Sequence, residues 1–189
     1  MKPGQTLEPH FHVANQFQLF IDGSGAFGRK DIIPFSVHYA NAYTPYGPIA
    51  AGENGLSYIT IRNGWDGGPK YLPKHRETLR TSGRTRRYVD PINIEFNASE
   101  AISQIFADGD DGLGGWVYRL KAGEKLTGPE PKIAGGQCWV VAEGSVEIGG
   151  KRLSRLACIF AEFGDPAITL TSGSEGGRVI MLQFPRWEH

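Results

Sequence analysis

The second half of this chain repeats the first, and that repeat limits the folds open to it. Residues 23–30 read GSGAFGRK and residues 144–151 read GSVEIGGK. The alignment extends in both directions, through residues 4–7 with 123–126, Gln16 with Gln137, residues 58–61 with 180–183, and Trp65 with Trp187. Self-similarity on this scale indicates that two copies of one structural unit make up most of the protein.

Composition indicates that each copy is built from strands. The 189 residues include 26 Gly and 12 Pro, which separate short aromatic and β-branched runs. Closely spaced turn residues of this kind are typical of β-sandwiches and barrels. Hydrophobic residues make up 40% of the chain, enough for a substantial core. We therefore expect an all-β globular protein in which helix is a minor component.

Charge and hydropathy argue against several classes of partner. Lys and Arg total 20, as do Asp and Glu, so no net field would attract nucleic acid or a membrane. No apolar run approaches the roughly 20 residues of a membrane span. Cys138 and Cys158 lie in apolar segments, and no charged-then-apolar leader follows Met1. These features predict a cytoplasmic protein with two reduced, core-filling thiols, a disulfide being the alternative.

Three histidines carry the chemistry of the first copy. His10 and His12 occupy alternate positions after a glycine turn, and His38 follows in a second strand-like run. Alternate residues of a strand leave the same face, so both imidazoles could bend toward one ion, and His38 could complete the set from a neighbouring strand. By the same parity Gln16, Gln18 and Phe20 should point into this interior. Three neutral nitrogen ligands suit a divalent transition metal.

The spacing around these histidines resembles the first motif of the cupin superfamily. That motif runs from a glycine through His-x-His to a glutamate and a second glycine. Gly4, His10, His12 and Gly23 keep its spacing, whereas Gln16 stands where the glutamate is expected. The second cupin motif has a weaker counterpart, in which Ser36 replaces a usual glycine, formed by Gly28, Pro34, His38 and Asn41.

The second copy resembles a cupin without metal ligands. On the same template its motif positions are Gly123, Pro129, Pro131, Gln137 and Gly144, with Ala161 about where His38 would fall. Proline cannot coordinate a metal. The resemblance therefore implies two jelly-roll barrels, or double-stranded β-helices, in tandem, one with a candidate metal site and one degenerate.

Domain boundaries follow from the same comparison. We expect a first barrel over residues 1–68, a basic Pro- and Gly-containing linker or crossing segment over 69–91, and a degenerate barrel over 92–189, with strands at 92–96, 103–107 and 116–120. Almost nothing precedes Gly4, so the leading strands of the first barrel must be missing or replaced, for example by residues 88–96 or a partner subunit. Because an unpaired sheet edge is a liability, we expect replacement or a homodimer.

The basic segment between the copies has a plain interpretation. Its cations are expected to form a solvated face balanced by Asp108, Asp110 and Asp111. Too few aromatic side chains interleave with them for a nucleic-acid site. His75 and His189 are interpreted as surface histidines. A small molecule is therefore the expected partner.

The resemblance assigns the metal site to His10, His12 and His38. Gln16 could supply an amide oxygen as a fourth ligand or hydrogen-bond a metal-bound water, and amide oxygen is the poorer donor. Tyr39, Tyr43 and Tyr46 follow His38; they are interpreted as packing residues or, alternatively, one of them lines the pocket mouth and donates a hydrogen bond to substrate, with Tyr43 the candidate.

Three functions remain open on the sequence alone. The first is a dioxygenase-like enzyme that holds Fe, or else Zn, Ni or Mn, and acts on a small chelating, oxygen-rich molecule. The second is a metal-dependent isomerase or lyase. The third is a non-catalytic ligand-binding or regulatory barrel, with the first copy decayed like the second. Three imidazoles and an amide would leave the full double charge on the metal, which favours chelating anions as substrates.

Overall fold

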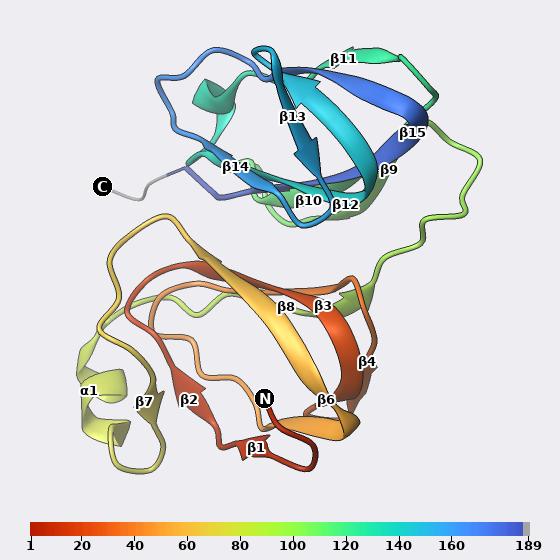
Figure 1. Ribbon diagram of the computed structural model, residues 1–189. Coiled ribbons are helices and arrows are strands. Elements are labelled where there is room, and N and C mark those ends of the chain that lie inside the picture. Colours follow the sequence, from red (N-terminus) through yellow and green to blue (C-terminus); the bar gives the residue numbers. More distant parts are fainter. Residues whose placement is uncertain (187–189) are drawn as a thin grey trace. The chain divides into compact units, whose positions relative to one another are not determined.

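The computed structural model describes residues 1–186, and the chain forms two compact units (Figure 1). The first is Met1–Ile94 and the second begins at Glu95. Both are β-structures, with helix confined to two short segments of the described residues, so the expected all-β class with tandem jelly-roll domains is confirmed. Trp187, the repeat partner of Trp65, and His189 lie outside the described residues.

The first unit is built around two long strands, β3 (Gln16–Phe27) and β6 (Ile49–Arg62). Its six-stranded sheet has the order β1-β6-β3-β5-β8, with β4 paired to β3. A two-stranded sheet joins β2 to β7. The remaining elements are β1 (Thr6–Leu7), β2 (His10–Phe11), β4 (Lys30–Ile32), β5 (Ser36–Ala40), β7 (Lys70–Tyr71), α1 (Arg76–Thr81) and β8 (Tyr88–Asn93).

Apolar side chains from both long strands close the first barrel. Phe20 and Phe27 of β3 pack with Ile49 and Leu56 of β6 in one buried cluster. At the start of β3, residues 16–20 are all buried, because β5 and β6 flank the strand on its two edges and both of its faces are covered. Of the two histidine-bearing strands, β5 therefore belongs to this buried sheet, whereas β2 pairs with β7 in the separate two-stranded sheet.

The second unit repeats this plan with β12 (Gln137–Ile148) and β15 (Thr169–Gln183) as its long strands. The sheet order is β13-β12-β15-β10-β9, with β11 paired to β15 and β14 to β12. The other elements are β9 (Ile102–Ala107), β10 (Gly114–Leu120), β11 (Lys125–Thr127), η1 (Pro131–Ile133), β13 (Lys151–Ser154) and β14 (Cys158–Ala161).

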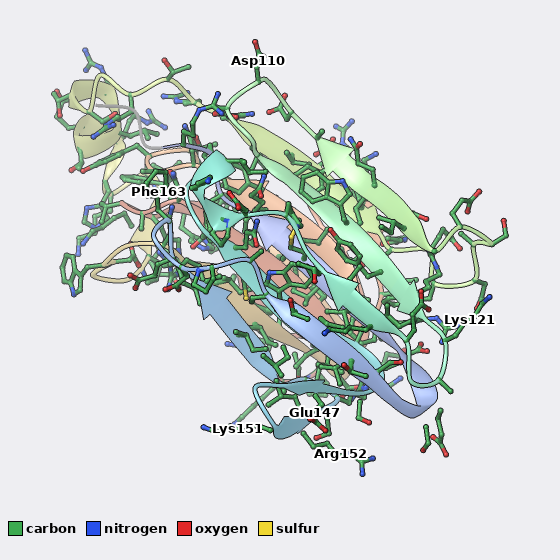
Figure 2. The ribbon with its side chains drawn as sticks, turned by 90° about the horizontal axis from the view of Figure 1, so that it is seen from above. Asp110, Lys121, Glu147, Lys151, Arg152 and Phe163 are labelled. Atoms are coloured by element: carbon green, nitrogen blue, oxygen red, sulfur yellow. The ribbon has the colours of Figure 1, made fainter. Side chains whose placement is uncertain are left out.

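Charged side chains mark the outer end of the β12–β13 hairpin. Figure 2 shows Glu147, Lys151 and Arg152 at this hairpin, pointing away from the barrel. Glu147 and Arg152 are direct cross-strand partners. Inside, Trp139 stacks on Tyr118 with ring centroids 5.1 Å apart. The charged side chains of the hairpin thus point to solvent, while Trp139, further back along β12, packs inside the barrel.

Backbone conformation supports the predicted repeat at its glycines. Gly23 and Gly144 have φ angles of 75° and 70°, and a Cβ atom on either would overlap a backbone carbonyl of the partner strand. The carbonyls belong to Gly55 and Gly176, so the two units build the same bulge from the same residue type. Only glycine fits a position that combines positive φ with such a close approach.

Strand pairing corrects two details of the repeat alignment. Gln16 pairs with Arg62 on β6, and Gln137 pairs with Gln183 on β15. Arg62 therefore corresponds to Gln183, one residue away from the predicted match. Because Gln16 aligns with Gln137, Gln18 aligns with Trp139. His38 lies opposite Gln18 on β5, and Ile159 lies opposite Trp139 on β14. Ile159 and not Ala161 therefore takes the place of His38.

The first unit extends further along the chain than the expected boundary at residue 68. Residues 69–91 include β7, α1 and most of β8, and β8 pairs with β5 in the first sheet. The predicted strand at 92–96 thus falls partly on β8 instead of opening the second unit. An uncovered edge on β5 would leave its backbone groups unpaired, and β8 satisfies them. The homodimer stays a prediction.

The two cysteines differ in exposure. Cys138 of β12 is buried, as predicted, but Cys158 at the start of β14 is exposed and does not fill the core. Both thiols are free. The hydrogen bond from the Cys138 thiol lowers the pKa of Cys158 to about 7, although partial burial acts in the opposite direction.

Alkylation should therefore be selective. Iodoacetamide is expected to modify Cys158 in the folded protein and to spare Cys138, because the reactive species is the exposed thiolate. The rate should rise as the pH increases through about 7, where Cys158 loses its proton. Peptide mass spectrometry after a timed quench measures both sites. Equal labelling of the two cysteines before unfolding would contradict the assignment.

Among residues 1–186, no helix is both long and apolar enough to cross a membrane.

Candidate metal centre

Three histidines come together inside the first barrel. His10 lies in β2, His12 directly follows that strand, and His38 is in the middle of β5. Their exposed fractions are 3%, 7% and 0%. The rings of His10 and His12 are edge to face with centroids 5.3 Å apart, so they share one side of the chain, as the alternation predicts. Burial of three imidazoles in one barrel is costly unless each has polar partners.

Each of these histidines has its Nδ1 atom held by an acceptor. His10 Nδ1 donates to the carbonyl of Glu8 at 2.7 Å, and His38 Nδ1 donates to the carbonyl of Val89 at 2.8 Å. His12 Nδ1 donates to Asp66 Oδ2 at 2.7 Å. Carbonyl and carboxylate oxygens accept hydrogen bonds, so the proton of each neutral ring is on Nδ1 and the lone pair is on Nε2. This arrangement is typical of metal-binding histidines.

The three imidazoles are neutral at neutral pH. Burial lowers the pKa of His38 to about 3, and the hydrogen bond to Val89 offsets only part of this effect. Burial also lowers the pKa of His10 and of His12 below the usual value. For His12 the neighbouring Asp66 acts in the opposite direction without cancelling the effect of burial. Neutral imidazole is the form that binds transition metals.

The buried neutral state of His38 predicts acid sensitivity of the metal-free protein. Below about pH 6.5 the unfolded chain takes up a proton at this position, whereas the folded protein does not until about pH 3. Because the unfolded state binds more protons in this window, stability falls as pH falls, by about 1.4 kcal/mol per pH unit. From pH 7.5 to 5.0, urea unfolding should show a loss about 2 kcal/mol larger than in His38→Gln. Equal losses of stability in wild type and His38→Gln would show that folding does not lower the pKa of His38.

Asp66 and Arg62 support His12 from the end of β6. Asp66 accepts hydrogen bonds from His12, from the Val13 amide at 3.0 Å and from the Gly68 amide at 3.0 Å. Burial raises the pKa of Asp66, but these bonds outweigh it and hold the pKa below the usual range. Arg62 Nη2 lies 3.7 Å from Asp66 Oδ2 and 3.2 Å from His12 Nδ1. Because His12 Nδ1 carries the proton donated to Asp66, Arg62 acts there as a neighbouring charge.

Gln16 is engaged at both ends of its amide. Its Nε2 donates to the hydroxyl of Tyr46, and its Oε1 accepts from Arg62 Nε at 3.1 Å. The predicted ligand oxygen therefore already has a donor in this structure. Gln16 is 1% exposed, so the side chain does point into the barrel as its parity predicts.

Tyr46 is the tyrosine that contacts the histidines. Reciprocal backbone hydrogen bonds of 3.1 and 3.0 Å join it to His10. Its ring centroid is 4.6 Å from that of His10, 5.0 Å from His38 and 6.3 Å from His12. Tyr43, the candidate from the sequence, instead has its ring against Phe11 at 5.9 Å and sits at a turn with φ of 62°.

The histidines are near one another but are not drawn tightly together. In the described part of the chain, no three His, Cys, Asp or Glu side chains are close enough to hold a metal ion. The Tyr46 ring packs against all three imidazoles. An ion bound by all three would therefore require these side chains to shift toward it. The donor set itself suits a transition metal, since His38 Nε2 is a buried acceptor that has no partner among residues 1–186.

Sequence reasoning did not identify Asp66 and Arg62. Asp66 lies in a loop without a motif, and its role depends on a chain reversal that brings it back to His12. The sequence offers a signal for Arg62, because it is a charged residue directly after the strand-like run 58–61. Asn41 of the second motif serves the fold: its Nδ2 donates to the Thr85 carbonyl at 2.7 Å and its Oδ1 accepts from the Arg87 amide at 2.8 Å.

The second barrel has different chemistry at the corresponding positions. Gln137 Nε2 donates to Gln183 Oε1 at 3.0 Å and to the Pro129 carbonyl at 3.2 Å. Trp139 Nε1 donates to Gln137 Oε1 at 3.1 Å. These hydrogen bonds engage both ends of the Gln137 amide, and the large ring of Trp139 lies beside it. The predicted degenerate site thus has a closed amide network where the first barrel has histidines.

No family model and no curated protein matches the sequence. Solved structures do match the fold. Bacterial pirin YhhW from Escherichia coli, in complex with nickel(II), has a TM-score of 0.58 and 14% identity, over 98% of this chain and 78% of that chain. Quercetin 2,3-dioxygenase from Acinetobacter baumannii has a TM-score of 0.56 and 14% identity, over 99% and 66%. Salicylate 1,2-dioxygenase from Pseudaminobacter salicylatoxidans has a TM-score of 0.58 and 11% identity, over 97% and 68%.

The fold is a cupin fold. At these identities the likeness concerns the fold, and function has to be argued from the side chains. Within the first unit, hydrogen bonds and close contacts connect His12, Gln16, Arg62 and Asp66 in one polar group. This polar group and the neighbouring His10 and His38 make up the candidate site of the first unit.

Proposed function

We propose that this chain is a metal-dependent cupin enzyme of the dioxygenase type that acts on a small, chelating, oxygen-rich organic molecule. The observation that carries the proposal is the set of three buried, neutral imidazoles, each with Nδ1 anchored and its Nε2 lone pair available for a metal. The solved structures with the same fold support it, since they include a nickel(II) complex and two dioxygenases.

His10, His12 and His38 would hold one divalent transition metal, with Fe first and Zn, Ni and Mn as alternatives. When bound, the metal would supply Lewis acidity and a site for oxygen chemistry. Three imidazoles leave its double positive charge uncompensated, so it would favour substrates that chelate as anions, such as enolates, keto acids or diketonates. Asp66 would fix the ring of His12, because it holds the Nδ1 proton and thereby the tautomer.

The surrounding residues would orient the substrate and exclude water. Phe20 and Phe27 are buried in the barrel and pack against each other, and the ring centroid of Phe27 is 4.5 Å from that of His38. Arg62 orders the Gln16 amide, and Gln16 in turn orders the Tyr46 hydroxyl. Gln16 would thus tune the site through Tyr46. Tyr43 remains a proposed substrate contact at the mouth of the barrel.

Oxygen dependence tests the proposal. Protein reconstituted with Fe(II) should consume oxygen with members of a panel of flavonols, hydroxybenzoates, keto acids and diketones, and His38→Ala should not. Turnover of the same panel without oxygen would instead assign a Lewis-acid isomerase or lyase. No turnover in either atmosphere, with metal bound, would contradict a catalytic role.

A ligand-binding role has one observation in its favour, a pocket in the second barrel. It has a volume of about 410 Å³, and its lining includes Trp116, Tyr118, Met181 and Gln183. Aromatic and apolar walls with one amide suit a small, flat, mostly apolar molecule. Saturable quenching of tryptophan fluorescence by such compounds, unchanged in His12→Ala, would support this function and separate it from the first barrel.

A further inference from the structure

Two buried polar atoms on neighbouring strands of the first barrel have no hydrogen-bond partner among residues 1–186. Gln18 of β3 lies directly opposite His38 of β5 in the sheet. Among residues 1–186, Gln18 Oε1 and His38 Nε2 are both buried and make no hydrogen bond. The two residues are 3% and 0% exposed. A buried polar atom without a partner costs free energy, so two on adjacent strands need an explanation.

These atoms cannot satisfy each other. The proton of His38 is on Nδ1, which donates to the Val89 carbonyl, so Nε2 presents a lone pair. Gln18 Oε1 is a carbonyl oxygen and also presents lone pairs. A species that is positively charged or donates hydrogen bonds would satisfy both of these acceptors, which lie on paired strands.

The fold does not require polar residues at this pair of positions. In the second barrel Trp139 corresponds to Gln18, and Ile159 corresponds to His38. Trp139 is almost fully buried, and its Nε1 donates to Gln137. The barrel without histidine ligands therefore fills these positions with apolar side chains that leave no unpaired acceptor. Of the two barrels, the one with polar residues at this pair of positions is the one with the candidate metal site.

We propose, resting on the metal-dependent function above, that Gln18 and not Gln16 supplies the oxygen ligand of the metal, through Oε1 beside His38. Gln16 lies two residues away on the same strand, but Arg62 Nε already donates to its Oε1. Its Nε2 is committed to Tyr46. Gln16 is therefore a positioning residue for Tyr46, whereas Gln18 has an oxygen that lacks a partner until a cation arrives. An amide oxygen with three imidazoles suits Ni(II), Zn(II) or Fe(II).

The two glutamines form a matched pair for the test. Methionine is close to glutamine in shape and has no strong acceptor. Gln18→Met removes an unpaired acceptor, so the metal-free protein should melt at the same temperature or higher. Gln16→Met strips partners from Tyr46 and Arg62, so the metal-free protein should melt at a lower temperature. Nickel(II) alone, titrated into chelator-treated protein by calorimetry, then reports the dissociation constant of each variant.

The expected result is opposite behaviour of the two variants. Gln18→Met should weaken nickel(II) binding at least about tenfold, and Gln16→Met should weaken it less. Gln18→Glu should bind nickel(II) more tightly than wild type, because a carboxylate adds charge compensation. That variant also decides the matter if Gln18→Met does not fold.

Several results would overturn the assignment. Unchanged nickel(II) affinity in Gln18→Met, a larger loss in Gln16→Met, or no gain in Gln18→Glu would each remove Gln18 from the ligand set. A metal-free Gln18→Met protein that melts well below wild type would show that the amide is needed by the fold. Wild-type protein that binds no nickel(II) would contradict the proposed function itself, which distinguishes the two failures.

Discussion

Replacing His12 with alanine is expected to abolish both metal retention and turnover. His12 is one of three neutral imidazoles in the barrel, and its Nδ1 proton is held by Asp66 at 2.7 Å. Removing it leaves two nitrogen donors and also leaves Asp66 without its ring partner. Metal content after gel filtration and oxygen uptake with an active substrate measure the two losses.

A matched control for this variant is His75→Ala. His75 lies at the start of α1 and makes no side-chain cap there, so its loss should leave metal content and turnover unchanged. Circular dichroism would verify that His12→Ala stays folded. Intact turnover in His12→Ala would remove the histidine site from the chemistry.

Replacing Gly23 with alanine is expected to destabilise the protein by more than about 3 kcal/mol. The residue has φ of 75°, and a Cβ atom would overlap the carbonyl oxygen of Gly55 on the neighbouring strand. Positive φ and the overlap act together, and the bulge between β3 and β6 has no room to relax. Thermal unfolding should show the transition of this unit lowered by at least about 12 °C.

Gly28→Ala separates strain from overlap. Gly28 has φ of 60°, but a Cβ atom there would meet nothing within 4 Å. Gly28→Ala should lower the free energy of unfolding by about 1 to 2 kcal/mol, because only the left-handed backbone conformation disfavours alanine there. Equal losses in the two variants would show that the close approach to Gly55 does not matter.

Local patterns were sufficient to predict the all-β class, and the resemblance to the cupin motifs predicted the tandem jelly-roll fold. Alternation placed His10 and His12 on one side, and their rings are in contact. The aligned glycines Gly23 and Gly144 both lie at bulges in the structure, where positive φ and close backbone approach leave few alternatives to glycine. Such features depend on neighbours in sequence or on one short strand pairing.

Features that depend on long-range pairing were placed less accurately. Register cannot be read without a partner strand, so Ala161 was assigned where Ile159 lies. The first unit extends to β8 because β8 pairs with β5, although the two strands are about 50 residues apart in the sequence. A pairing this distant leaves no mark in the local sequence pattern. Asp66 reaches His12 through a loop, and nothing in its immediate sequence marks it.

The two glutamines show how a site prediction can be refined by contacts. The resemblance predicts a role for Gln16 at the metal, because it occupies the position of the motif glutamate. Which amide oxygen has a partner depends on Arg62, which approaches from another strand. The sequence therefore predicts two inward glutamines, and the hydrogen bonds distinguish their roles.

Elemental analysis tests the central claim most directly. Protein purified without a histidine tag, and reconstituted under anaerobic conditions, is compared with a His10→Ala, His12→Ala double variant. The account predicts about one transition-metal ion per chain in wild type, as in a single three-histidine site, and none in the variant. No metal in wild type after reconstitution, or equal metal in both proteins, would contradict it.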